Sequence, residues 1–241
     1  MDMSEIKDSE LKLQGFIRQK DRVHFVVRVK TKVGNVTSEQ MAALSDIARK
    51  YGRGYIYLTN RLNIIIPWIA QENLGEVKLA VEKTGLVVGG TGPTVRPIVA
   101  CVGTICEHGL ADTQLLGKML DERLFGRRLP AKIKIGITGC PNDCSKVEIN
   151  DIGFMGRRSK EAKSAKNPEG ECYAIYLGGM FGRDHREGQR AGPLLTPEEA
   201  VAMTEKIIDY MEKNAKPGER LGKLIDRVGM DEVLKAIGLQ P

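Results

Sequence analysis

No apolar run in this 241-residue sequence is long enough to cross a membrane as a helix. The best candidate, residues 62–70, is short and is interrupted by Pro67. The first residues are polar and lack the apolar core of a secretion signal, so we expect a cytoplasmic protein with no membrane partner.

Aromatic residues are also scarce. They make up 5% of the chain, and only one of them is tryptophan. No stretch interleaves them with basic residues, as nucleic-acid-binding surfaces do, so we expect no nucleic-acid partner. The net charge of +6 suits anionic ligands or an acidic partner protein without choosing between them. The hydrophobic content of 41% is enough for a full core.

Cysteine is rare as well, but four of the five cysteines form two short pairs. Cys101 and Cys106 lie five positions apart, and Cys140 and Cys144 lie four positions apart. Thiols stay reduced in the cytoplasm, so paired cysteines there favour metal binding over disulfides. Spacing alone leaves open an iron–sulfur cluster, a structural zinc ion and no metal at all. Cys172 stands alone in a strand pattern, where we expect a small buried residue.

The first part of the chain shows the order strand, helix, strand, strand, helix, strand. Strands are expected over residues 23–30, 55–60 and 62–66 and near Val88, and helices from Thr37 to Gly52 and from about Leu74 to Gly85. This order is typical of the split βαβ, ferredoxin-like arrangement.

A glycine-rich connection, residues 89–93, leads to the part that carries the cysteine pairs. We expect helices over residues 110–120 and from Thr196 onward, strands over residues 131–138 and 172–177, and a mobile polar loop over residues 158–170. The predicted fold class is α+β, with a ferredoxin-like half-domain over residues 1–90 and a second domain over residues 91–241.

Two pairs of basic residues lie on predicted strands. Lys132 and Lys134 are two positions apart, so their side chains share one face, and Arg28 and Lys30 repeat this geometry. Such pairs are also typical of a solvated face. Beside four cysteines, however, two cationic faces favour an anion-binding pocket, which an iron–sulfur centre explains better than zinc does.

With these features on one chain, the sequence resembles the sirohaem-dependent nitrite and sulfite reductases, over residues 23–237. The resemblance is carried by the stretches VRVKTKVGNVT, YGRGYIYLTNR, VRPIVACVGTIC, LPAKIKIGITGCPNDC, NDIGFMG and RLGKLIDRVGMDEVLKAI. The Gly-Cys-Pro-Asn-Asp-Cys run after a Lys-x-Lys strand is the specific part. The chain is most similar to the small, single-unit members, and the second domain is then their 4Fe–4S and sirohaem-binding α+β domain.

The resemblance implies cofactors and site residues. It implies a 4Fe–4S cluster on Cys101, Cys106, Cys140 and Cys144, with the Cys144 thiolate also bridging to the iron of sirohaem. The catalytic, anion-binding residues that it implies are Lys30, Arg96, Lys132 and Lys134. Candidates for the rim of the sirohaem are Thr59, Arg61, Asn142, Gly178 and Gly179.

The sequence departs from the family pattern in four ways. The first two cysteines have four residues between them rather than the usual five, and Lys30 replaces a more common arginine. Larger members contain two fused copies of this unit, whereas this chain has one. The further ferredoxin-type cysteine run of some relatives is absent, so electrons must enter from outside or directly through the single cluster.

The expected activity is the six-electron reduction of sulfite to sulfide or of nitrite to ammonia. The expected partners are the small oxyanion, a reduced ferredoxin or similar acidic donor, and a second copy of the chain in a homodimer or larger homo-oligomer. Two alternatives remain at this stage: a non-catalytic iron–sulfur electron-transfer subunit and a zinc-stabilised binding module.

Overall fold

The computed structural model describes residues 6–165 and 167–239. The chain forms two compact units, Met1–Gly92 and Pro93–Pro241, and each is described by itself. None of the helices within the described residues is both long and apolar enough to span a bilayer.

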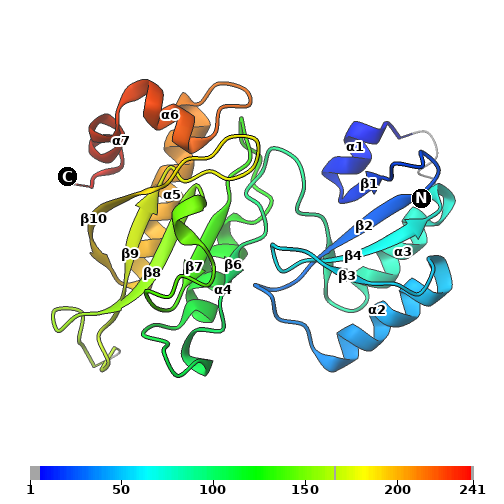
Figure 1. Ribbon diagram of the computed structural model, residues 1–241, viewed down its shortest axis with the longest axis horizontal. Coiled ribbons are helices and arrows are strands. Elements are labelled where there is room, and N and C mark those ends of the chain that lie inside the picture. The colour runs from blue at the N-terminus through cyan, green and yellow to red at the C-terminus, as the bar shows by residue number, and fades with distance from the viewer. Residues whose placement is uncertain (1–5, 166, 240–241) are drawn as a thin grey trace. The chain divides into compact units, whose positions relative to one another are not determined.

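The first unit is a sheet of five strands with two helices on one face (Figure 1). Its strands are β1 (Phe16–Arg18), β2 (Phe25–Lys30), β3 (Tyr57–Leu58), β4 (Ile64–Ile69) and β5 (Val87–Val88). Its helices are α1 (Asp8–Leu13), α2 (Ser38–Tyr51) and α3 (Leu74–Glu82), with a 3₁₀ turn η1 (Gln71–Asn73). Strand β2 pairs with β1, β4 and β5, and β4 pairs with β3, all antiparallel.

The ferredoxin-like order predicted for this unit is confirmed. Phe25, Val27 and Val29 of β2 are fully buried, and Thr37 caps α2 in a reciprocal capping box with Gln40. The strand predicted over residues 55–60 is shorter than expected, because only Tyr57–Leu58 pairs and a five-residue turn precedes β4. Helix α1 and strand β1 were not predicted, since six- and three-residue elements leave little periodic signal.

The second unit is a five-stranded mixed sheet in the order β10–β9–β8–β7–β6. Its strands are β6 (Val99–Ala100), β7 (Ile135–Thr138), β8 (Ile152–Arg158), β9 (Glu171–Leu177) and β10 (Gln189–Leu195). Strands β6, β7 and β8 run parallel, and β9 and β10 continue the sheet antiparallel. Parallel strands bring the loops that follow them to one edge of the sheet, which positions both cysteine pairs.

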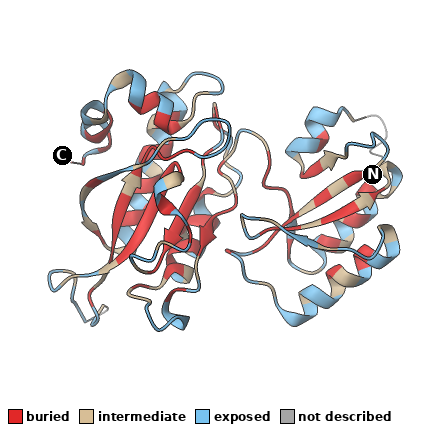
Figure 2. Cartoon of the chain, viewed as in Figure 1, coloured by how far each residue is buried: buried red, intermediate tan, exposed pale blue. Residues whose placement is uncertain are grey.

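The helices of this unit are α4 (Thr113–Leu124), α5 (Pro197–Asn214), α6 (Leu221–Val228) and α7 (Met230–Ile237). Helices α4 and α5 contact one another and the sheet, and α6 and α7 contact α5. The 3₁₀ turns are η2 (Gly103–Ile105) and η3 (Val147–Ile149). The central strands β7, β8 and β9 are buried along nearly their whole length (Figure 2).

Most predicted elements of the second unit are confirmed, with shifted bounds. Helix α5 begins at the predicted cap, where Thr196 and Glu199 form a capping box. The predicted strand over residues 131–138 forms only as Ile135–Thr138, although Ile133 is buried as expected. Strands β6, β8 and β10 were not predicted. Strand β8 is buried on both faces and shows no alternation, and β10 contains Gly192 and Pro193 at a break in its register.

Candidate functional site

The first cysteine pair follows strand β6 directly. Cys101 is the residue after β6, and Cys106 ends the 3₁₀ turn η2. The carbonyl oxygen of Cys101 accepts hydrogen bonds from the Thr113 hydroxyl at 2.7 Å and from the Gln114 side-chain amide at 2.8 Å. The N-terminus of α4 therefore holds the backbone of this loop in place.

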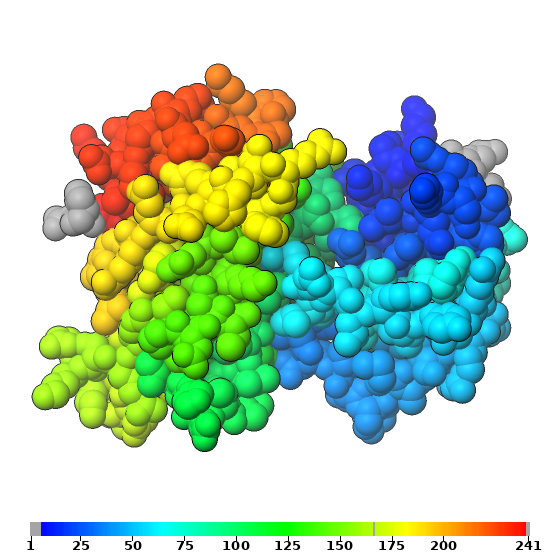
Figure 3. All heavy atoms as spheres, viewed as in Figure 1, coloured from blue at the N-terminus to red at the C-terminus, as the bar shows by residue number. Residues whose placement is uncertain are grey.

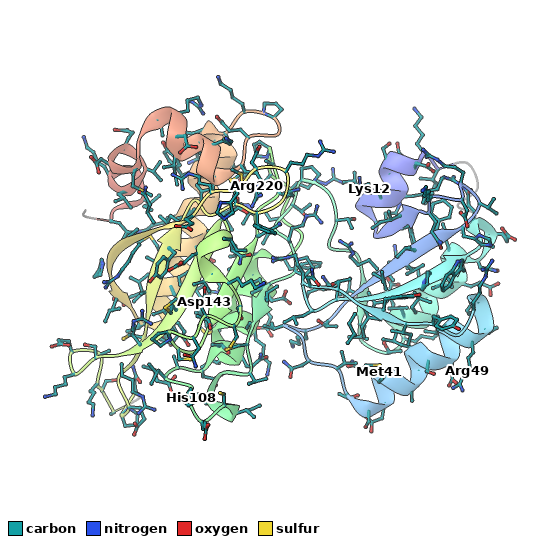
Figure 4. The ribbon with its side chains drawn as sticks, in the orientation of Figure 1. Lys12, Met41, Arg49, His108, Asp143 and Arg220 are labelled. Atoms are coloured by element: carbon teal, nitrogen blue, oxygen red, sulfur yellow. The ribbon has the colours of Figure 1, made fainter. Side chains whose placement is uncertain are left out.

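The second pair lies in a tight turn after β7. Cys140 comes two residues after the strand, and Asp143 adopts a left-handed backbone conformation with φ of 47°. The Asp143 carboxylate accepts the backbone N–H of Val147 at 2.9 Å, which closes the turn around Cys144. Burial raises the pKa of Asp143, and the N–H groups of Val147 and Glu148 oppose that rise. Asp143 is labelled in Figure 4.

The two cysteine loops are joined at one edge of the sheet. Strands β6 and β7 are parallel neighbours, with Ala100 opposite Ile137. The backbone N–H of Gly139 donates a hydrogen bond to the sulfur of Cys101 at 3.2 Å, and the carbonyl of Gly139 accepts the N–H of Leu110 at 2.9 Å. The fold therefore brings together loops that are 38 residues apart in the sequence.

The four paired cysteines differ from Cys172 in exposure. Cys106 and Cys144 are exposed, Cys101 and Cys140 are partly buried, and all five are free thiols. Cys172 is buried in β9, as predicted, and burial raises the pKa of its thiol. Among the described residues, no three His, Cys, Asp or Glu side chains are grouped around a single metal-ion position. A 4Fe–4S cluster instead takes one thiolate on each of its four irons.

A cationic group surrounds Lys132, just before β7. The ammonium of Lys132 is partly desolvated and is repelled by the guanidinium groups of Arg220, Arg96 and Arg183. Together these effects lower the pKa of Lys132, although the carboxylate of Asp151 opposes the shift. Three predicted anion-binding residues, Arg96, Lys132 and Lys134, therefore lie in one unit, near a buried carboxylate.

Lys134 is fixed through its backbone and its side chain. Its backbone N–H donates to Asp151 Oδ2 at 2.8 Å, and its ammonium donates to the carbonyl of Phe181 at 3.2 Å. Asp151 is fully buried and forms a two-pronged ion pair with Arg220, at 2.6 Å and 3.0 Å. Phe181 lies in the connection between β9 and β10, an exposed segment that is yellow in Figure 3.

The remaining predicted cation of the anion-binding group, Lys30, lies in the first unit. Lys30 ends β2 and is 9% exposed, and it shares with Arg28 the sheet face opposite the core. Burial lowers the pKa of Arg28. Arg61 and Thr59 lie in the turn between β3 and β4, where the Thr59 hydroxyl accepts the N–H of Asn63 at 3.1 Å.

The other rim candidates lie in the second unit. Asn142 is exposed in the second cysteine loop. Gly178 donates its N–H to the carbonyl of Asp151 at 2.8 Å, and its own carbonyl accepts from Arg186 at 2.9 Å. A Cβ on Gly179 would overlap the backbone carbonyls of Glu148 and Asn150. Both glycines thus make close internal contacts, and their contact with a cofactor stays a prediction.

Sequence reasoning missed four residues that shape these sites. Thr113 and Gln114 hold the first cysteine loop, and Asp151 and Arg220 hold the lysine segment. A capping signal did exist at Asp112, whose carboxylate accepts the N–H groups of Gln114 and Leu115. No local pattern marks Asp151, because its partner is 69 residues away.

Both units match known protein families. Residues 91–240 match the family described as "Nitrite and sulphite reductase 4Fe-4S domain". Residues 17–83 match "Nitrite/Sulfite reductase ferredoxin-like half domain". The chain belongs to the nitrite and sulphite reductase family. Members of the nitrite and sulphite reductase family are oxidoreductases, and the match indicates a 4Fe–4S cluster and sirohaem as cofactors.

Individual relatives of the nitrite and sulphite reductase family differ in length. The chain is 26% identical to "Sulfite reductase, assimilatory-type" of Nitratidesulfovibrio vulgaris, covering 93% of this chain and 97% of the relative. It is 31% identical to "Ferredoxin--nitrite reductase, chloroplastic" of Arabidopsis thaliana, covering 78% of this chain but only 32% of the relative. The solved structure of the NirA protein of Mycobacterium tuberculosis shares the fold. Its TM-score is 0.81 at 18% identity, over 98% of this chain and 47% of that one.

The residues present fit the two cofactors of the nitrite and sulphite reductases. Four free thiols on two joined loops supply the ligand chemistry of a 4Fe–4S cluster. Buried polar atoms without a hydrogen-bond partner in residues 6–165 and 167–239 include Arg28 Nε, Asn63 Oδ1 and Thr138 Oγ1. Buried polar groups normally have partners, and Thr138 Oγ1, in the residue before Gly139 of the second unit, is a donor that a carboxylate of the macrocycle can satisfy.

Proposed function

We propose that this protein reduces sulfite to sulfide, or nitrite to ammonia, by six electrons. The observation that carries the proposal is the junction of the two cysteine loops in a chain that matches the nitrite and sulphite reductases in both units. When bound, the cluster would pass on electrons from a donor, and sirohaem would supply the iron that holds the anion. The protein supplies placement, charge and protons.

We assign the cluster to Cys101, Cys106, Cys140 and Cys144. The N–H of Gly139 already donates to the sulfur of Cys101, so the loop of the second pair lies directly against the first cysteine. Cys144 would serve the sirohaem as well as the cluster, as the family resemblance implies. Arg61, Thr59, Asn142 and the Gly178–Gly179 backbone are the proposed contacts to the rim of the macrocycle.

Arg96, Lys132 and Lys134, with Lys30 of the first unit, are the proposed catalytic cations. Their charges would neutralise a bound oxyanion and stabilise negative charge on its oxygens as these leave as water. Lys132 is suited to proton delivery, because its lowered pKa makes the ammonium a better acid than an ordinary lysine. Bulk water can return the proton, since Lys132 is exposed.

Two partners belong to the same proposal. Electrons would come from a reduced ferredoxin or a similar acidic protein, since opposite charges speed the encounter with a chain of net charge +6. A second copy of the chain would cover the cofactor, taking the place of the second fused unit in larger relatives.

The deciding experiment is an absorption spectrum of the purified protein with iron, acid-labile sulfide and zinc analysis. Kinetics on sulfite and on nitrite with a reduced dye would follow. We expect the bands of sirohaem, four cluster irons plus one macrocycle iron, and reduction of at least one anion. Iron and sulfide without a macrocycle band would identify an electron-transfer subunit instead. Zinc without iron would overturn both readings.

A further inference from the structure

A buried ion pair lies beneath the cationic group around Lys132. Asp151 is fully buried, and both of its carboxylate oxygens face Arg220, at 3.0 Å from Nε and 2.6 Å from Nη2. The side chain of Arg220 is 11% exposed, and this residue directly precedes α6 (Figure 4). Removing two charges from water is costly, so a pair of this kind calls for an explanation beyond stability.

Asp151 also connects three segments through its carboxylate and its backbone carbonyl. The carboxylate accepts the backbone N–H of Lys134, which leads into β7, and it binds Arg220, which precedes α6. Its backbone carbonyl accepts the N–H of Gly178, where the segment between β9 and β10 begins. That segment supplies the carbonyl of Phe181, which accepts the ammonium of Lys134. Asp151 thus contacts the backbone of Lys134, and it also anchors the segment whose Phe181 carbonyl binds the Lys134 ammonium.

Charge around Lys132 is unbalanced in the same place. The groups that act on its ammonium are Arg220 at the start of α6, Arg96 before β6, Arg183 between β9 and β10, and Asp151 before β8. Three of these four are guanidinium groups and repel the lysine. Asp151 is the only one that attracts it.

We propose that Asp151 and Arg220 are positioning residues for the anion site, holding Lys134 in place and setting the charge balance at Lys132. Asp151 offsets part of the repulsion between the cations while the anion is absent. Burial raises the pKa of Asp151, and the two hydrogen bonds and the positive charge of Arg220 oppose that rise. The catalytic meaning of this arrangement rests on the proposed function, but the arrangement can be tested without it.

The test is the reactivity of Lys132 in the folded full-length protein. Trace acetylation with acetic anhydride over a pH series, read by peptide mass spectrometry, gives an apparent pKa for Lys132. Asp151→Asn removes an attraction, so the apparent pKa should fall. Arg220→Gln removes a repulsion, so it should rise. Each shift is expected to be on the order of one pH unit.

Shifts of opposite sign in the apparent pKa of Lys132 distinguish a positioning role from simple structural support. If the ion pair only stabilised the fold, Asp151→Asn and Arg220→Gln would both loosen the site and hydrate Lys132. The apparent pKa of Lys132 would then rise in both variants, because water stabilises the charged form. A rise or no change in folded Asp151→Asn protein therefore overturns the proposal. Arg220→Lys is the second variant, useful if Asp151→Asn does not fold. It keeps the positive charge, so the Lys132 value should stay near that of the wild type, and a rise equal to that of Arg220→Gln would also overturn the proposal.

The chain offers a matched control. Exposed Asp209 forms an ion pair with half-buried Arg127 at 2.8 Å in the same unit, so Asp209→Asn makes the same chemical change away from Lys132. Asp209→Asn should leave the apparent pKa of Lys132 unchanged. Acetylation of exposed Lys213 serves as the internal reference for the amount of reagent in every sample.

Kinetics supply the second arm. In Asp151→Asn, kcat/KM for the reduced anion should fall about tenfold while the cofactor spectrum is unchanged, and its pH profile should shift with the Lys132 value. If the protein reduces neither anion, the proposed function fails while the labelling result still stands. If the protein reduces an anion but the pH profile of kcat/KM does not shift with the apparent pKa of Lys132, only the catalytic part of this inference fails.

Discussion

The backbone N–H of Gly139 donates a hydrogen bond to the sulfur of Cys101, at 3.2 Å. This bond connects the residue before one cysteine of the second pair to the first cysteine of the other pair. It requires that the loop after β7 lie directly beside the loop after β6. The junction is therefore sensitive to any residue that moves Gly139.

Gly156 of β8 is such a residue. A Cβ at Gly156 would overlap the carbonyl oxygen of Gly139, a backbone atom that cannot rotate away. Gly156→Ala should shift Gly139, weaken its bond to Cys101 and reduce cluster content by more than half, with a stability loss of about 1–3 kcal/mol. Iron and sulfide analysis with urea unfolding measures both quantities.

The matched control is Gly139→Ala. A Cβ there meets its nearest atoms at 3.4 Å, which is ordinary contact. This variant should keep most of its cluster. Equal cluster loss in both variants would show that the junction tolerates no alanine at either position, whatever the room available, and would contradict the prediction.

Thr113 makes the second prediction. It is fully buried, and its hydroxyl donates to the Cys101 carbonyl at 2.7 Å. Thr113→Val keeps the shape but leaves that carbonyl with only the Gln114 donor, so we expect a stability loss of about 1 kcal/mol and faster loss of cluster absorbance in air.

Thr204 of α5 offers a control of equal burial. Its hydroxyl donates to the carbonyl of Ala200, also at 2.7 Å, within one helix. Thr204→Val should not change the decay of cluster absorbance. If both valine variants lose the cluster at the same rate, the Thr113 bond has no particular role at the cysteine loop.

How far the sequence predicts this protein depends on how local the signal is. The helix starts at Thr37 and Thr196 and the strand β2 have local signals, and each was predicted within two residues of where it begins. Strand β8 was missed because burial on both faces removes the alternation. The Asp151–Arg220 pair was missed because only the tertiary fold brings these residues together.

The site residues divide in the same way. Motif spacing singled out the four paired cysteines, and the structure joins their loops through Gly139. Strand periodicity placed Lys132 and Lys134 on one face. It did not predict that Lys134 would be held by a buried carboxylate, because nothing in the sequence marks an aspartate as buried.

The assignment of the cluster ligands makes the third prediction. Serine at position 101, 106, 140 or 144 should remove most of the cluster, since a hydroxyl is a poor ligand for iron in this setting. Cys172→Ser is the control, because Cys172 is buried in β9 and should leave iron and sulfide unchanged. A variant at one of the four positions with full cluster content would remove that cysteine from the ligand set.

The last prediction concerns stability and pH at Lys132. Its pKa is lowered from the ordinary value of 10.5, first by partial burial and then by Arg220 and Arg96. The folded protein therefore binds the Lys132 proton less tightly than the unfolded chain does, and charged Lys132 opposes folding at neutral pH. Lys132→Met should lower activity but raise the free energy of unfolding at pH 7.

This gain should shrink as the pH rises toward 10.5, because lysine at position 132 then loses its charge in the folded protein and, last, in the unfolded chain. Urea unfolding of both proteins at pH 7 and pH 10 measures the difference. Lys213→Met, at an exposed position of α5, should change stability little at either pH. Two results would contradict the prediction: a Lys132→Met protein less stable than the wild type at pH 7, or a gain in stability that grows with pH. Either would show that the charge of Lys132 does not destabilise the folded protein.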